Sequence, residues 1–298
     1  MQSSTATTVF LPIALAVIMF GLGLSLTLRD FARVLRYPKA AVVALSCQIL
    51  LLPAICLLLV LAFRLSPALS VGMMLLAASP GGTTANLFSH LARGDVALNV
   101  TLTAINSVLA VVTMPIVINL SVAYFMADDA AVGLQFDKVV QVFAIVLVPV
   151  ALGMLVNRRY TAFANRMRAP VKLASIVFLV ATIGLAVFQE RENIAGYFQA
   201  VGLVAALFSV LSIGIGYLAP RLLRIGRRQA IAASMEIGIH NSVLAITVAL
   251  SPALLNNAEM AIPAAVYGVV MFGTAGLFGF AISRRVRAQE AEATVQGT

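Results

Sequence analysis

Apolar runs long enough to cross a bilayer follow one another along almost the whole chain of 298 residues, with short polar segments between them. A helix needs about 20 apolar residues to cross the hydrocarbon core, and these runs have that length. Only 10% of the residues are charged, too few to give every helix of a soluble protein a water-facing side. The short alternating segments of a transmembrane β-barrel do not occur in the sequence. We therefore predict an all-α polytopic membrane protein.

We predict nine transmembrane helices, and the positions of the basic residues support that number. The expected spans are residues 8–28, 40–62, 68–92, 97–124, 137–157, 169–188, 196–219, 229–250 and 262–283. Under this assignment, 17 of the 20 Lys and Arg residues lie on one side of the membrane. The positive-inside rule then places the N-terminus outside and the C-terminus in the cytoplasm. The net charge of +9 follows from this topology, so we expect no nucleic-acid partner.

The whole chain, residues 1–298, is expected to form a single membrane domain. No segment between spans is long enough for a soluble domain, and residues 288–298 are expected to form a disordered cytoplasmic tail. The N-terminus lacks the basic residues that open a cleaved signal peptide, so we expect the first span to be retained. Arginine outnumbers lysine by 17 to 3, which favours a bacterial inner membrane.

Two of the spans contain residues that interrupt a helix near the middle of the membrane. Residues 79–86 read Ser-Pro-Gly-Gly-Thr-Thr-Ala-Asn, and residues 236–242 read Glu-Ile-Gly-Ile-His-Asn-Ser. Proline removes a backbone donor, glycine weakens a helix, and unwound backbone at this depth must be satisfied by protein or by a water-filled cavity. Because the two spans run in opposite directions, the pattern indicates an inverted-repeat transporter with two broken helices and a midplane site. The alternative is a pair of kinks that allow close helix packing.

Glu236 is the only acidic residue in the middle of a long apolar segment. Burying a carboxylate at this depth costs at least ~2.5 kcal/mol, so such a residue usually faces a cavity or a partner. Asn99, Thr103 and Asn106 are spaced i, i+4 and i+7 along one helix face, and Gln48 is another amide in an apolar stretch. Their oxygens are ligands that a hard cation prefers. Interhelical hydrogen bonding, worth only ~0.6 kcal/mol per contact, is an equal alternative for the stripe.

These motifs resemble those of the bile acid:sodium symporter family. Residues 79–86, followed by residues 91–98, are similar to its first crossover motif, and residues 236–242 are similar to its second. Residues 19–24 with Asp30 and Phe31 match its opening segment. The resemblance implies a nine-span transporter in which a core domain (spans within 40–124 and 196–283) moves against a panel domain (spans within 8–28 and 137–188). It also implies symport of an organic anion with one or two sodium ions.

The resemblance implies two sodium sites as well. The residues implied for the first site are Asn86, Asn99, Thr103 and Glu236. Those implied for the second site are Gln48, Glu236 and His240. Two features depart from the family pattern. Ala85, which precedes Asn86, stands where serine is usual, and the last span has Met271 and Phe272 where many members have a His-Asn pair. Substrate identity therefore does not follow from the resemblance.

His240 is a third departure, because the family usually has glutamine there. Imidazole nitrogen is a poor sodium ligand, and a histidine titrates near neutral pH. On a continuous helix His240 would share a face with Glu236, so an imidazolium could pair with that carboxylate and replace the second sodium by a proton. The other interpretation is a neutral histidine that forms hydrogen bonds in the core.

We expect the substrate carboxylate to meet the N-terminal ends of the broken helices, since no Lys or Arg lies at mid-membrane. The side chains expected beside it are Thr83, Thr84, Asn241 and Ser242. An enzyme is not expected, because the sequence has no H-E-x-x-H or G-x-S-x-G motif and no evident nucleophile. A passive channel and an exporter are the remaining alternatives. Besides the anion and the bilayer, no obligate protein partner is evident.

Overall fold

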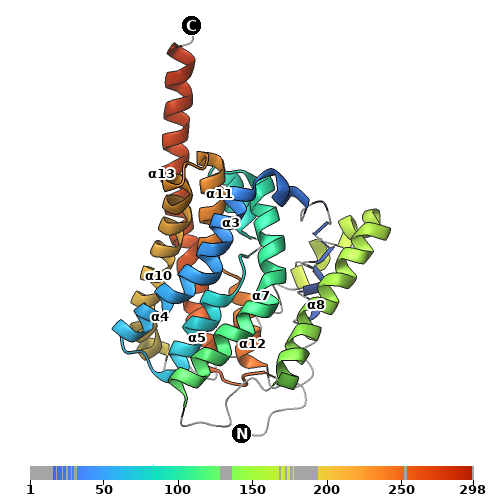
Figure 1. Ribbon diagram of the computed structural model, residues 1–298, viewed down its shortest axis with the longest axis vertical. Helices are drawn as coiled ribbons and strands as arrows, with labels where there is room; N and C mark the ends of the chain where they lie inside the picture. Colours follow the sequence, from blue (N-terminus) through green and yellow to red (C-terminus); the bar gives the residue numbers. More distant parts are fainter. Residues whose placement is uncertain are drawn as a thin grey trace.

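In the computed structural model, the secondary-structure elements of the described residues are helices (Figure 1). The described residues are 16–17, 19–21, 23–24, 26–27, 29, 32–82, 84–127, 136–167, 169–171, 173–174, 177, 194–251 and 254–296. Most of the expected spans 8–28 and 169–188 lie outside them, as does Thr83.

Each of the other seven predicted spans has a helical counterpart. The helices are α3 (Pro38–Ser46), the π-helical turn η2 (Cys47–Leu51), α4 (Leu52–Ala62), α5 (Pro67–Ala78), α6 (Thr84–Leu91), α7 (Val96–Phe125), α8 (Phe136–Arg159), α10 (Ile194–Leu222), α11 (Arg227–Gly238), α12 (Ser242–Leu250) and α13 (Ile262–Gln296). Two short 3₁₀ turns, η1 (Arg33–Arg36) and η3 (Glu259–Ala261), precede α3 and α13. Four helical segments are long and apolar enough to cross a bilayer, namely Pro38–Ala62, Val96–Phe125, Phe198–Leu222 and Glu259–Arg284. The chain is therefore a helical membrane protein.

Local sequence explains where helices begin. Pro67 occupies the first position of α5, where a missing N–H removes no intrahelical hydrogen bond. The Ser66 hydroxyl caps this helix by accepting a hydrogen bond of 3.3 Å from the backbone N–H of Leu69. The Asp95 carboxylate caps α7 through the N–H of Leu98 at 3.1 Å.

Both predicted helix interruptions are present. α5 ends at Ala78, the next residue, Ser79, is extended, and α6 begins at Thr84. α11 ends at Gly238, and α12 begins at Ser242. Each interruption therefore divides one predicted span into two shorter helices.

The C-terminal residues differ from the prediction of a disordered tail beyond residue 287. α13 continues as a helix as far as Gln296 and extends past the other helices (Figure 1). Residues 288–293 read Ala-Gln-Glu-Ala-Glu-Ala, and these are residue types with high helix propensity. The helix that precedes them is already nucleated, so it extends through them.

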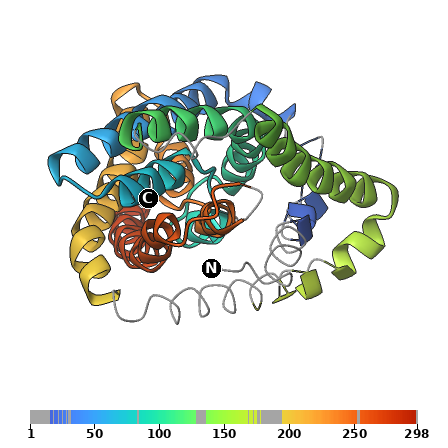
Figure 2. The same ribbon diagram turned by 90° about the horizontal axis from the view of Figure 1, so that it is seen from below.

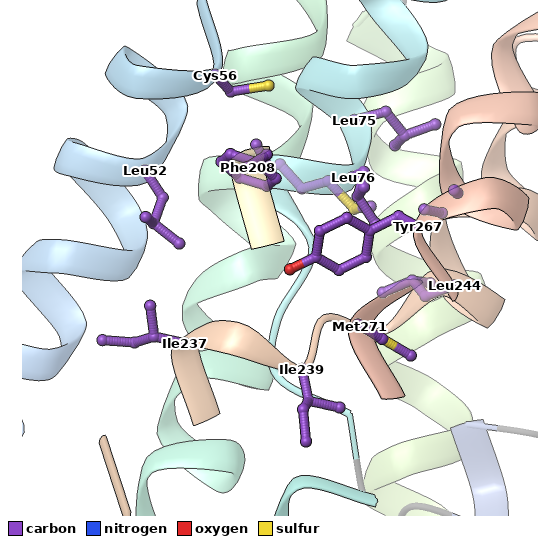
Figure 3. Packing of buried hydrophobic residues seen from close by; sticks show 14 of the residues in the cluster. Leu52, Cys56, Leu75, Leu76, Phe208, Ile237, Ile239, Leu244, Tyr267 and Met271 are labelled. Carbon is purple, nitrogen blue, oxygen red and sulfur yellow. The ribbon is translucent and has the colours of Figure 1, made fainter. Parts of the chain in front are cut away.

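The buried core is formed where α4, α5, α10, α11, α12 and α13 meet. Figure 3 shows Leu52 and Cys56 of α4, Phe208 of α10, Ile237 of α11 and Tyr267 of α13 converging there, all of them buried. The interruptions at residues 79–82 and 239–241 therefore lie inside packed protein, while large apolar side chains on the outer faces are exposed as expected toward lipid.

α8 lies to one side of this helix group, beside the described residues of the first predicted span (Figure 2). Gly23 and Gly153 allow the two segments to approach closely, because a Cβ added at Gly23 would stand 3.0 Å from the Gly153 Cα. The Asn157 side chain donates a hydrogen bond of 2.9 Å to the carbonyl of Leu26. These contacts join α8 to the beginning of the chain.

Candidate cation and substrate site

The two helix interruptions pair with each other across the core. Gly81 and His240 form an antiparallel bridge between them. The Gly82 N–H donates to the Ile239 carbonyl at 2.7 Å, and the Asn241 N–H donates to the Pro80 carbonyl at 2.8 Å. Backbone groups without a partner are costly at membrane depth, so each interruption stabilises the other by satisfying two of these groups.

Gly81 makes room for the Glu236 carboxylate. A Cβ added at Gly81 would overlap both carboxylate oxygens and the carbon between them. Because even alanine would fill this space, the pairing of the interruptions and the position of the acid depend on the same glycine.

Glu236 lies in the last turn of α11 and is 2% exposed. Its Oε2 accepts a hydrogen bond of 2.5 Å from the Thr103 hydroxyl on α7, and the Asn106 side chain lies beside the same carboxylate. No hydrogen bond to its Oε1 is formed by the described residues. The backbone N–H of Gly81 also faces the carboxylate, so Thr103 holds Oε2 firmly while Oε1 is only weakly satisfied by the described residues.

Two buried amide oxygens, like Glu236 Oε1, accept no hydrogen bond from the described residues. Asn99 donates from Nδ2 to the Ala232 carbonyl at 2.7 Å, and its buried Oδ1 has no donor among the described residues. Gln48 donates from Nε2 to the Ser79 carbonyl at 3.0 Å, and no donor to its Oε1 is found in the described part of the chain. Gln48 lies in the π-helical turn of the second predicted span, and such turns are frequent at functional sites.

Each of these three buried oxygens, which accept no hydrogen bond from the described residues, is of a type that a hard cation prefers. An unsatisfied buried acceptor costs about 1–3 kcal/mol, and a cation that takes oxygen ligands would remove that cost. The structure brings Thr103 into contact with Glu236, and it ties Asn99 to α11 and Gln48 to the first interruption. Asn86 lies in the first turn of α6 next to the fully buried Ala85.

His240 lies in an aromatic environment. It is 1% exposed, and its ring makes edge contacts with Phe208 and Tyr267 at centroid distances of 5.4 and 5.3 Å. Neither ring nitrogen has a hydrogen-bond partner among the described residues, so no hydrogen bond joins the imidazole to Glu236. Glu236 and His240 do not share a face of one continuous helix, because α11 ends between them at Gly238.

Sequence reasoning missed Tyr267. This side chain of α13 is fully buried, and its hydroxyl donates a hydrogen bond of 2.9 Å to the Gly238 carbonyl at the end of α11 (Figure 3). The signal was a tyrosine in an apolar run, since a buried phenol usually finds a hydrogen-bond partner. Tyr267 therefore holds the second interruption through its backbone.

The expected substrate residues that the structure describes lie at the beginning of α6 and α12. Thr84 is the first residue of α6, and Ser242 is the first residue of α12. Asn241 caps α12, with its Oδ1 accepting a hydrogen bond of 3.1 Å from the N–H of Leu244. The Ser242 side chain is buried, and its hydroxyl has no hydrogen-bond partner in the described part of the chain.

Comparison with known proteins identifies the family. The model of the sodium bile acid symporter family matches residues 12–197. The chain belongs to this family. It is a family of transporters rather than of enzymes, so sodium-dependent transport across a membrane is the general activity.

Named relatives cover most of the chain. It is 28% identical over 260 residues to the uncharacterized sodium-dependent transporter YocS of Bacillus subtilis, a match that covers 87% of this chain and 78% of the relative. It is 30% identical over 261 residues to the probable sodium/metabolite cotransporter BASS1 of Arabidopsis thaliana chloroplasts, covering 86% of this chain and 62% of the relative. It is 26% identical over 243 residues to the human ileal sodium/bile acid cotransporter, covering 80% of this chain and 68% of the relative.

Proposed function

We propose that the protein is a secondary active transporter that carries an organic anion together with sodium by alternating access. The observation that supports this most strongly is that buried oxygens of Glu236, Asn99 and Gln48, near two paired helix interruptions, have no donor among the described residues. The names of the relatives, which include a sodium/bile acid and a sodium/metabolite cotransporter, agree with the coupling ion and the substrate class.

We assign the first sodium ion to Glu236, Asn99, Thr103 and Asn86. The hydrogen bond from Thr103 leaves one carboxylate oxygen of Glu236 for the ion, and the Asn99 amide offers its own oxygen. A second ion would draw on Gln48, Glu236 and position 240. The aromatic contacts of His240 make this second position the weaker one, because imidazole offers no oxygen ligand.

Alternating access requires two bodies that move against each other. We propose nine spans in an inverted repeat, with α3 to α7 and α10 to α13 in the core and α8 in the panel. The separate position of α8 and its contacts with residues 23–26 support this division. The N-terminus lies outside and the C-terminus in the cytoplasm of a bacterial cell. The anion would bind where α6 and α12 begin, beside Thr83, Thr84, Asn241 and Ser242.

The test uses the full chain in proteoliposomes, with uptake of a labelled carboxylate driven by an inward sodium gradient. Wild type and Glu259→Gln should accumulate the substrate, because Glu259 lies away from the site and accepts a hydrogen bond from Ser66. Glu236→Gln should lose at least about 100-fold in sodium affinity, as is typical of removing a buried charge from a paired site. Flux that ignores the sodium gradient would instead indicate a passive channel.

Proton coupling through His240 is a second candidate, and one observation favours it. Both ring nitrogens are buried and have no hydrogen-bond partner among the described residues, so a proton taken up there would change the charge beside the site. Sodium coupling and proton coupling can be separated by measuring uptake over a range of external pH and sodium in wild type and in His240→Gln. Pure sodium coupling predicts the same pH profile for both proteins, whereas proton coupling predicts that the variant loses a pH-dependent component.

A further inference from the structure

Phe88 on α6 and Phe272 on α13 form a stacked aromatic pair that the predicted site residues do not include. Their ring centroids are 5.9 Å apart, and the ring planes differ by 16°. Phe88 is partly buried, and Phe272 remains 42% exposed. Further along both helices, a Cβ added at Gly279 would lie 3.6 Å from the Ala92 Cβ, so α6 and α13 run side by side in the same direction.

The aromatic pair lies one helical turn from the beginnings of α6 and α12. Thr84, the first residue of α6, precedes Phe88 by four positions and shares its helix face. Gly268 precedes Phe272 by four positions, and a Cβ added there would stand 3.4 Å from the Ser242 hydroxyl. Four residues of helix rise about 6 Å, so the rings lie about that far from Thr84 and Ser242 along the helix axes.

The beginning of α12, at Ser242, is suited to an anion. Ser242 opens the nine-residue helix α12, is 7% exposed, and keeps a hydroxyl without a hydrogen-bond partner in the described residues. A helix N-terminus carries a partial positive charge, which favours a carboxylate. This buried hydroxyl could donate a hydrogen bond to a carboxylate.

We propose that the substrate is a carboxylate with a flat ring about 6 Å from its charged group, and that Phe88 and Phe272 bind the ring. This inference rests on the proposed function, because it names the substrate class of the same site. Aromatic rings attract one another beyond the area they bury, so the exposed face of Phe272 discriminates between a flat ring and an aliphatic chain. The rings select the substrate, and the helix beginnings hold its charge.

The experiment measures thermal stabilisation of the purified full chain in sodium by three probes. These are 3-phenylpropionate, hexanoate, which lacks the ring, and 3-phenylpropionamide, which lacks the charge. Wild type should bind 3-phenylpropionate about tenfold more tightly than hexanoate, and the amide should not bind. Phe272→Ala should remove the tenfold preference. Phe280→Ala, which deletes a ring of 59% exposure two turns further along α13, should retain it.

Each outcome decides a different claim. Equal affinity of wild type for 3-phenylpropionate and hexanoate, or a preference that survives in Phe272→Ala, overturns the ring site and leaves sodium-coupled transport of a carboxylate intact. Such a result would mean that lipid alone covers the two rings. No stabilisation of wild type by either carboxylate, with or without sodium, overturns both the ring site and the proposed anion site.

Discussion

Replacing Gly81 by alanine tests whether the crossing of the two interruptions forms the cation site. The added Cβ would stand 2.6 Å from Glu236 Oε2 and nearer still to Oε1, whereas ordinary contacts begin at 3.4 Å. The carboxylate must therefore move by about 1 Å, much more than the ~0.2 Å tolerance of ligand distances in metal sites. We expect the sodium affinity to fall about 100-fold, and overpacking to destabilise the protein by about 1–3 kcal/mol.

Sodium titrations of uptake measure the sodium affinity, and thermal unfolding measures the loss of protein stability. Gly214→Ala is the matched control, because a Cβ added there meets no heavy atom within 4 Å and alanine favours the interior of α10. The control should keep the wild-type sodium affinity and melt at the wild-type temperature or above it. A Gly81→Ala protein that retains the wild-type sodium affinity would refute the placement of the ion against Glu236.

Three further substitutions test individual contacts. Thr103→Val removes the donor to Glu236 and should lower the sodium affinity in uptake assays about tenfold, whereas Thr103→Ser should restore it. Tyr267→Phe removes only the hydroxyl that donates to the Gly238 carbonyl. Sodium titrations of uptake should show a several-fold weaker sodium affinity and an unchanged maximal rate. A lower maximal rate with unchanged sodium affinity would contradict this role. Asp95→Ala should destabilise the protein by about 1 kcal/mol by uncapping α7, and thermal unfolding should show that Asp95→Asn does not.

The helix interruptions could be predicted because their cause is local. Pro80 with the glycines that follow it, and Gly238 with the polar residues that follow it, weaken a helix whatever packs around them. The contact of Thr103 with Glu236 agrees with the family resemblance, which groups the two residues, whereas the polar stripe alone left interhelical hydrogen bonding as an equal alternative.

The surroundings of His240 could not be predicted because they depend on the packing of distant helices. Phe208 comes from α10 and Tyr267 from α13, and no spacing within residues 236–242 indicates that either ring lies there. The expected alignment of His240 with Glu236 assumed a continuous helix, but α11 ends between them at Gly238. A break in the helix removes the periodicity on which such a spacing argument depends.

The break after Gly238 is also the reason why a cation would suit the position beside Glu236. An interrupted helix loses intrahelical hydrogen bonds, and the pairing of Gly82 with Ile239 and of Asn241 with Pro80 replaces some of them. The pairing brings the Glu236 carboxylate against Gly81, where its Oε1 finds no donor among the described residues. A sodium ion bound there would satisfy the remaining acceptor and stabilise the crossing by RT ln(1 + [Na⁺]/Kd). Sodium would then favour the paired arrangement of the two interruptions, and this arrangement would also position Ser242 and the beginning of α12 for the proposed anion.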